Sequence, residues 1–262
     1  MTSIPRVDDG VHTIDLNSDL GEGFGPWLMG DDESLLSLVS SANVACGYHA
    51  GDATTMRRTC TGAVARSVRI GAHVAYRDLA GFGRRDIDVP AAALTNDVLY
   101  QIGALAACAR AAGGEVSYLK PHGALYNRIV WDPEQAGAVV EAVRLYDPTM
   151  PVLGLPGSEF LMLAEQAGLP TAGEGFVDRG YDGAGRLVPR GVAGALVHDP
   201  KVAAERAVQM AVAGTVLSID GQLVAVHPRS LCVHGDTPGA TEIARHVRHA
   251  LHDADVRLSS FA

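Results

Sequence analysis

Lysine is nearly absent from this chain: of its 21 basic side chains only Lys120 and Lys201 are lysines, and the other 19 are arginines. Because arginine is the usual cation here, a lysine at one particular place suggests a need for a compact ammonium group. Acidic side chains number 30, and the formal net charge of −9 argues against nucleic acid as a partner.

Signals for membranes, export and disulfides are missing as well. No run approaches the roughly 20 apolar residues that a membrane helix needs. The first residues, MTSIPRVDDGVHT, lack the basic start and apolar stretch of a secretory signal, so we expect a cytoplasmic protein. The four cysteines, Cys46, Cys60, Cys108 and Cys232, form no CxxC pair. We expect reduced thiols and no structural zinc site.

Three common catalytic motifs do not occur: the GxGxxG dinucleotide loop, the GxxxxGK[ST] phosphate loop and the GxSxG nucleophile elbow. A nucleotide would therefore bind in another geometry or on a partner. Cys46 lies close to His49, but chain neighbours in a turn seldom form a nucleophile and base pair, so we expect a buried thiol there.

Apolar runs alternate with amphipathic stretches, a pattern typical of βα units around a parallel sheet or barrel. Seven strands are predicted, at Val11–Asn17, Ser41–Cys46, Ile70–Tyr76, Val116–Lys120, Val152–Leu155, Thr171–Val177 and Ser230–His234. Helices are predicted at Asp52–Ser67, Pro90–Ala112, Asp132–Tyr146, Ser158–Ala167, Pro200–Val212 and Pro238–Ala254. With 47% hydrophobic residues and no linker or repeat, residues 1–262 are expected to form a single domain.

Three segments depart from this alternation. Arg77–Val89 and Arg179–Asp199 are long and rich in glycine and arginine, and loops of this length are usually functional or disordered. Asp220 and Gly221 stand between two apolar runs and predict a hairpin over Val216–Val226.

Polar side chains follow six of the seven predicted strands. They are Asp15, Asn17, Asp19 and Glu22; Asn43, His49 and Asp52; His73, Tyr76 and Asp78; Lys120, His122 and Tyr126; Glu174, Asp178, Arg179 and Tyr181; and His234 and Asp236. Because parallel α/β folds place their sites at the carboxyl ends of the strands, this pattern predicts an active site there.

Each of these groups also has a structural interpretation. Asp15 could be a buried hydrogen-bonding residue or a cap, Asp52 an N-cap, and single histidines satisfied structural residues. Arginines 84, 85, 179 and 190 resemble anion clamps, although ordinary loop arginines are the alternative. The i, i+3 series His246, His249 and His252 lies on a solvated helix face, and we expect no function for it.

Six motifs together resemble the LamB/YcsF family, the A subunits of bacterial ATP-dependent 5-oxoprolinases. They are DLNSDLGEG, SANVACGYHAGD, GAHVAYRDLAGFGRR, LKPHGALYN, EGFVDRGYDGAGRLVPR and LCVHGDTPGA. The match runs in order from about Asp15 to Ala250. One departure is Val74, where the family usually has proline after the histidine; this changes backbone stiffness and leaves the polar residues in place.

The resemblance implies a seven-stranded β/α (TIM-like) barrel of the type shared with glycoside hydrolases and polysaccharide deacetylases. It also implies a hydrolase that converts 5-oxo-L-proline, ATP and water to L-glutamate, ADP and phosphate. Two further subunits, B and C, are needed for this activity, and one of these partners could hold the ATP.

Opening a stable five-membered lactam requires activation of its carbonyl, attack by water, a general base and a cation for the oxyanion. We expect Asp19 as base or metal ligand, Lys120 on the oxyanion or phosphate, and Arg179 or Arg84 on the substrate carboxylate. The catalytic candidates are Asp15, Asp19, Glu22, Lys120 and His122. The substrate-binding candidates are Asn17, Asn43, His49, His73, Tyr76, Arg84, Asp178, Arg179, His234 and Asp236.

Similarity to deacetylase-like barrels also points to a divalent metal on Asp19, His73 and His122, and a metal-free hydrogen-bonded site is the alternative. Two other functions compete with the oxoprolinase role. One is a free-standing metal-dependent deacetylase or carbohydrate hydrolase. The other is a non-catalytic scaffold, against which the density of ionisable groups at one end argues.

Overall fold

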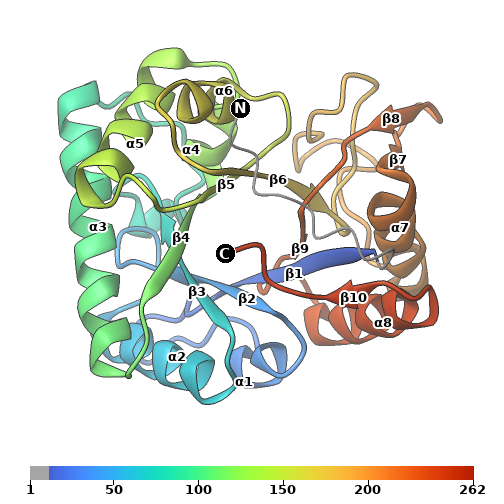
Figure 1. Ribbon diagram of the computed structural model, residues 1–262, viewed down its shortest axis with the longest axis horizontal. Helices are drawn as coiled ribbons and strands as arrows, with labels where there is room; N and C mark the ends of the chain where they lie inside the picture. Colours follow the sequence, from blue (N-terminus) through green and yellow to red (C-terminus); the bar gives the residue numbers. More distant parts are fainter. Residues whose placement is uncertain (1–11) are drawn as a thin grey trace.

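A closed barrel of seven parallel strands forms the centre of the computed structural model, which describes residues 12–262 (Figure 1). The barrel strands are β1 (Thr13–Leu20), β2 (Ser41–Ala45), β3 (Arg69–Val74), β4 (Val116–Pro121), β5 (Val152–Gly154), β6 (Thr171–Phe176) and β9 (Ser230–Val233). Each pairs with the next, and β9 pairs back with β1. The predicted barrel is thereby confirmed. Val11, where the first strand is predicted to begin, and the segment searched for a signal lie outside the described residues, apart from His12 and Thr13.

Helices surround the barrel (Figure 1). They are α1 (Asp32–Leu36), α2 (Ala53–Ala65), α3 (Ala91–Ala111), α4 (Gly123–Arg128), α5 (Pro133–Tyr146), α6 (Glu159–Gln166), α7 (Pro200–Ala213) and α8 (Ala240–Asp253). Asp52 is an N-cap, as its structural interpretation predicts: its carboxylate accepts from the backbone N–H groups of Thr54 and Thr55. The short helices α1 and α4 are not predicted, because five or six residues are too few to display a helical period.

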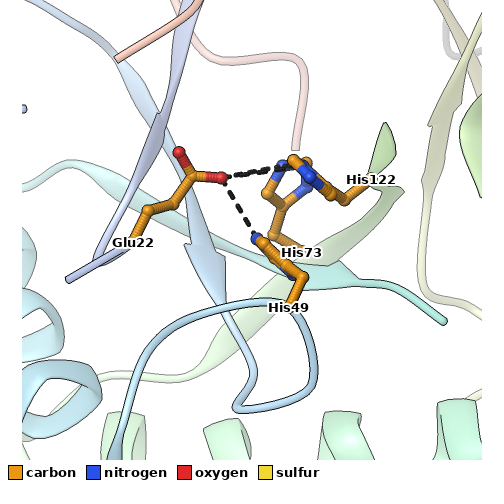
Figure 2. A group of neighbouring side chains, drawn as sticks. All are labelled: Glu22, His49, His73 and His122. Atoms are coloured by element: carbon orange, nitrogen blue, oxygen red, sulfur yellow. Dashed lines mark hydrogen bonds and ion pairs between the residues drawn. The ribbon is translucent and has the colours of Figure 1, made fainter. Parts of the chain in front are cut away.

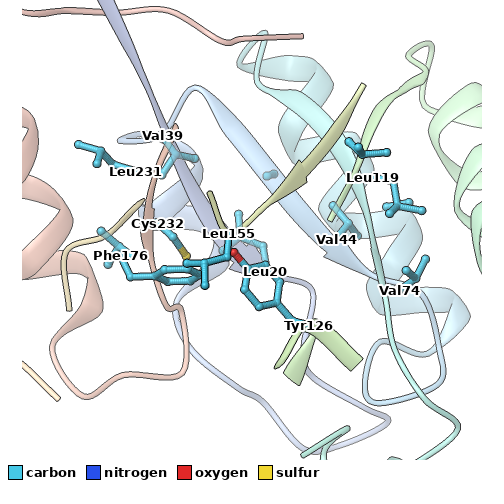
Figure 3. Packing of buried hydrophobic residues seen from close by; sticks show 14 of the residues in the cluster. Leu20, Val39, Val44, Val74, Leu119, Tyr126, Leu155, Phe176, Leu231 and Cys232 are labelled. Atoms are coloured by element: carbon cyan, nitrogen blue, oxygen red, sulfur yellow. The ribbon is translucent and has the colours of Figure 1, made fainter. Parts of the chain in front are cut away.

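Alternation along the strands separates a polar barrel interior from an apolar layer beneath the helices. On β1, Asp15, Asn17 and Asp19 alternate with the buried Leu16 and Leu20. Figure 3 shows buried side chains of the apolar cluster, among them Val44, Val74 and Leu119 from three neighbouring strands. Burying such residues supplies the main stabilisation of the fold, which allows the interior to carry ionisable groups.

The C-terminal segment closes the amino end of the barrel. Strand β10 (Arg257–Leu258) pairs with the first residues of β1. Beyond it, the Phe261 ring packs edge-on against Tyr118, with ring centroids 4.9 Å apart, in a small apolar cluster with Leu153 and Ala172. A strand of two residues has no readable sequence pattern, so this closure is not predicted.

Two further predictions concern the remaining segments. The hairpin is confirmed, because β7 (Thr215–Leu217) and β8 (Leu223–Ala225) pair antiparallel around the Asp220–Gly221 turn. Among the described residues, no helix combines the length and apolar character needed to cross a membrane.

The helix predicted from Pro238 begins two residues later, at Ala240, because Gly239 before it has a left-handed φ of 80°.

Candidate active site

A cavity of about 530 Å³ opens at the carboxyl ends of the barrel strands, where the sequence predicts the active site. Seven of the predicted catalytic and substrate-binding residues line it: Asp19, His73, Arg84, Lys120, His122, Arg179 and His234. The wall also includes residues that the sequence analysis does not assign to the site, among them Asn127, Trp131, Arg186 and Leu187. Polar and charged groups from distant parts of the chain therefore meet at one place.

Lys120 is held between two buried carboxylates at the floor of this cavity. Its ammonium Nζ lies 2.9 Å from Asp19 Oδ1 and 2.8 Å from Glu174 Oε1. Nζ also contacts Cys232 Sγ at 3.2 Å and Asn17 Oδ1 at 3.3 Å. Since an ammonium group has only three protons to donate, these contacts use its full capacity and hold it in one place.

The charges of this group stabilise one another. Burial acts to lower the pKa of Lys120, but Asp19 and other nearby groups that favour the cation hold it well above its usual value. Burial likewise acts to raise the pKa of Asp19, yet His73 and Lys120 keep it well below the ordinary value. Lys120 is therefore a permanent cation and Asp19 a permanent anion at neutral pH.

Two asparagines predicted to bind substrate instead support the ion group from below. Asn43 Nδ2 donates to Asp19 Oδ1 at 2.8 Å and to Asn17 Oδ1 at 2.7 Å. Asn17 Nδ2 donates in turn to Glu174 Oε1 at 3.1 Å. Neither asparagine lines the cavity. Asp19 Oδ2 makes no hydrogen bond within residues 12–262, so this oxygen is free to accept a proton from a ligand.

Asp178 and His234 form a second pair beside Asp19. The imidazole Nδ1 of His234 lies 2.9 Å from Asp178 Oδ1, and the His234 backbone N–H donates to Asp178 Oδ2. Burial acts to raise the pKa of Asp178, but His234 and other donors hold it below the usual value. An ionised Asp178 fixes the Nδ1–H tautomer and leaves His234 Nε2 as an acceptor.

Glu22, His49, His73 and His122 converge on one point at the cavity wall (Figure 2). One donor atom from each lies within 4.8 Å of the other three. Burial lowers the pKa values of His49 and His122 and raises that of Glu22 well above its usual value. Two members of the predicted trio, His73 and His122, thus lie with Glu22 and His49, which the trio does not include. The third, Asp19, groups with Cys232 and His234, and its Oδ1 also lies 3.4 Å from His73 Nε2.

The loop of residues 77–89 covers the histidines and is built around Asp78. The Asp78 carboxylate caps the 3₁₀ turn Leu79–Gly81 and pairs with Arg85. The Phe82 ring then packs edge-on against His49 and His122. Gly83 follows with φ of 66°, and a Cβ there would lie 2.8 Å from both His49 and His122. Only glycine lets the loop approach this closely.

Arginines of the two long loops have different roles. The Arg179 guanidinium is buried and donates to the backbone oxygens of Val188 and Ala195, which holds the second loop in place. Arg84 pairs with Asp236 at 2.5 Å on the cavity rim. Arg190 also lines the cavity and makes no hydrogen bond or ion pair within the described part of the chain. Like Arg186, whose hydrogen bonds within the described residues use only its backbone atoms, it is available to bind an anion.

Two predicted residues lie apart from this site. Tyr76 is buried and donates to Gln135 Oε1 of α5 at 3.0 Å. Asp15 lies near the start of β1, and its carboxylate accepts hydrogen bonds from the hydroxyls of Ser40, Ser41 and Ser230. This placement agrees with the structural interpretation of Asp15 as a buried hydrogen-bonded residue.

The environment of Asp15 predicts a pH effect on stability. Burial raises its pKa from 3.8 to about 6, so the folded chain keeps the proton over a range in which the unfolded chain releases it. The contribution of Asp15 to stability is present below about pH 4 and is lost as the pH rises through 6. At about 1.4 kcal/mol per pKa unit, the loss is about 3 kcal/mol.

Asp15→Asn cannot ionise and should not show this loss. Denaturant unfolding of both proteins is measured at pH 4 and at pH 8. Between these two pH values, the unfolding free energy of the parent should fall by up to about 3 kcal/mol relative to that of the variant. Parallel pH profiles would contradict this assignment.

Comparisons with known proteins agree with one another. The sequence profile of the LamB/YcsF family matches residues 14–262. The chain is similar to the 5-oxoprolinase A subunit of Streptomyces avermitilis, with 62% identity over 95% of this chain and 100% of that protein. It is also similar to the 5-oxoprolinase A subunit of Mycobacterium avium, with 56% identity over 95% and 98% of the two chains.

Among solved structures, the chain is similar to a lactam utilization protein from Thermus thermophilus, with 42% identity and a TM-score of 0.91. This likeness covers 95% of the present chain and 100% of the other. The two chains therefore share their fold over nearly their whole length.

Proposed function

We propose, from the premise that this chain belongs to the LamB/YcsF family, that it is the A subunit of a 5-oxoprolinase. In this role it opens the lactam ring of 5-oxo-L-proline to give L-glutamate, with hydrolysis of ATP to ADP and phosphate. The B and C subunits complete the enzyme, which acts in the cytoplasm, and the chain serves it as one domain. The observation that carries the proposal is the near-full-length identity to relatives of that name.

The cavity offers what a small anionic lactam needs. Arg84, Arg190 and Lys120 bring positive charge to it. Arginine binds a carboxylate through two parallel N–H groups, so an arginine of the rim holds the substrate carboxylate and points the ring toward Lys120. Arg84 becomes available for this contact once its ion pair with Asp236 opens. Arg190 has no competing partner among the described residues. Arg179, the other candidate, already donates to two backbone oxygens.

The chemistry proceeds by transfer of the terminal phosphoryl group of ATP to the lactam carbonyl oxygen, followed by attack of water on the carbon. The C–N bond then breaks as the nitrogen takes up a proton, which leaves an acyl phosphate, and a second water hydrolyses this to the free carboxylate and phosphate. Asp19 accepts the proton of the first water through Oδ2. The Lys120 ammonium, 2.9 Å from Asp19 Oδ1, stabilises the negative charge that develops on oxygen. His234, oriented by Asp178, is the second acceptor within the cavity and is suited to return a proton to the leaving nitrogen.

A divalent metal, if bound at Glu22, His73 and His122, would supply Lewis-acid stabilisation of an oxygen at the cavity wall. The donor set fits such an ion because it combines imidazole nitrogens with one carboxylate. Glu22, His49 and His122 then serve the site through the ion, and the substrate contacts are left to the Asp19 and Lys120 side of the cavity.

The test is ATP-dependent glutamate release from 5-oxoproline by this chain, alone and mixed with candidate B and C subunits. We expect glutamate only from the mixture. No glutamate from a folded chain whose partners work with another A-type chain would refute the proposal. Deacetylase activity of the chain alone, without ATP, would then be assayed, since it is the competing function.

A further inference from the structure

His73 and His122 face each other with unprotonated ring nitrogens. His73 Nδ1 lies 3.1 Å from the backbone oxygen of Lys120, and His122 Nε2 lies 3.0 Å from that of Phe82. A carbonyl oxygen can only accept, so each of these two nitrogens carries its ring's proton. In the neutral rings, His73 Nε2 and His122 Nδ1 therefore present bare lone pairs. These two atoms are only 3.0 Å apart.

Two bare lone pairs at that distance repel each other unless a cation lies close to both. A third donor points at the same place, because Glu22 Oε1 lies 3.6 Å from His122 Nδ1 and 4.0 Å from His73 Nε2. His49 Nε2 completes the group at 3.1 Å from the same carboxylate oxygen. Figure 2 shows the four side chains directed inward from different strands and loops.

The separations match those of a metal coordination shell. Ligand atoms at the usual 2.0–2.2 Å from a tetrahedral zinc ion lie about 3.3–3.6 Å from one another. The three contacts among Glu22, His73 and His122 are 3.0, 3.6 and 4.0 Å and centre on this value. The backbone oxygens of Lys120 and Phe82 act as the outer partners that orient histidine ligands in metal sites.

We propose that Glu22, His73 and His122 bind one divalent transition-metal ion of the zinc type, with His49 hydrogen-bonded to Glu22 behind them. His73 and His122 also line the cavity, which places the ion at the cavity wall beside the Asp19–Lys120 pair. Glu22 and His49 lie behind them and shield the ion from solvent. The loop of residues 77–89 closes over the site through Phe82.

His49 supports the ligand set without joining it. Its ring stacks face to face on that of His122, with ring centroids 3.8 Å apart and planes 8° apart. An ion in the plane of the His122 ring therefore lies outside the plane of the His49 ring, in which the His49 lone pair points. With its proton on Nε2, His49 donates to Glu22, and one coordination position faces the cavity, as catalytic zinc sites require.

The experiment uses the full chain, stripped of metal with a chelator that is then removed, without ATP or 5-oxoproline. Calorimetric titration with Zn²⁺ should give one ion per chain, and Co²⁺ should produce the visible absorption of a low-coordinate site. Glu22→Gln and His122→Gln should each weaken binding at least tenfold, because changes even to outer-shell partners cost about 10–100-fold. The exposed His249→Gln is the matched control and should bind like the parent.

A measurement on the unaltered chain guards against variants that fail to fold. In ¹⁵N spectra of the metal-free protein, His73 should be the Nδ1–H and His122 the Nε2–H tautomer, and Zn²⁺ should shift His73 Nε2 and His122 Nδ1. A doubly protonated ring that Zn²⁺ leaves unchanged would mean that a shared proton holds the pair, and the proposal would fall. Binding equal in the parent and both site variants would also overturn it. Since no substrate is present, these results do not depend on the oxoprolinase assignment.

Discussion

Asp19→Asn is expected to lower the rate of glutamate release about 10²–10⁴-fold, the usual effect of removing a general base. The amide has the size of the carboxylate and can still occupy the place between Asn43 and Lys120, so the fold should survive. What it loses is the anionic Oδ2 that accepts the proton of water. The rate is measured in the complete complex at saturating 5-oxoproline and ATP, with the circular dichroism spectrum as a check of folding.

Asp15→Asn is the matched control, because it changes the other aspartate of β1 that faces the barrel interior. Its carboxylate bonds to serines and does not line the cavity, so turnover should stay close to that of the parent. If Asp19→Asn keeps normal turnover while His234→Gln abolishes it, the proton acceptor is the Asp178–His234 pair and the role given to Asp19 is wrong.

Lys120→Met is expected to lower the free energy of unfolding by about 3–5 kcal/mol, the cost of leaving a buried charge without its partner. Methionine has a similar volume, so the effect is electrostatic: Asp19 and Glu174 would remain buried with no cation between them. Turnover should be lost as well, because the oxyanion then has no counter-charge on the cavity floor. Stability is measured by denaturant unfolding and turnover by glutamate release.

The second lysine provides the control, since Lys201→Met removes an exposed ammonium at the start of α7 and should change neither quantity. Adding Glu174→Gln to Lys120→Met should restore part of the lost stability, because one of the two unpaired carboxylates is removed. A double variant no more stable than Lys120→Met would show that Lys120 contributes through packing and not through charge.

Features that depend on neighbouring residues are predictable from the sequence, and contacts between distant strands are not. Strand positions, the capping role of Asp52 and the hairpin at Asp220–Gly221 follow from patterns within a few residues, and the structure confirms them. Composition alone singles out Lys120 as a candidate, because it is one of two lysines among many arginines. Glu174 was found at a strand end, yet its pairing with Lys120 was not predicted, since no local signal connects two strands that lie apart in the barrel.

By itself, the sequence determined the β/α order, the end of the barrel at which the cavity opens and the inventory of ionisable groups there. Tertiary structure alone decided which of them meet: Glu22 with the three histidines, Lys120 with two carboxylates, and Asp15 and Tyr76 elsewhere. The reason is physical. Strand and helix patterns are local, whereas closure of the barrel joins β9 to β1 across more than two hundred residues and aligns side chains by strand register. Register selects the face and level of each side chain, and a sequence without its pairing partners does not specify it.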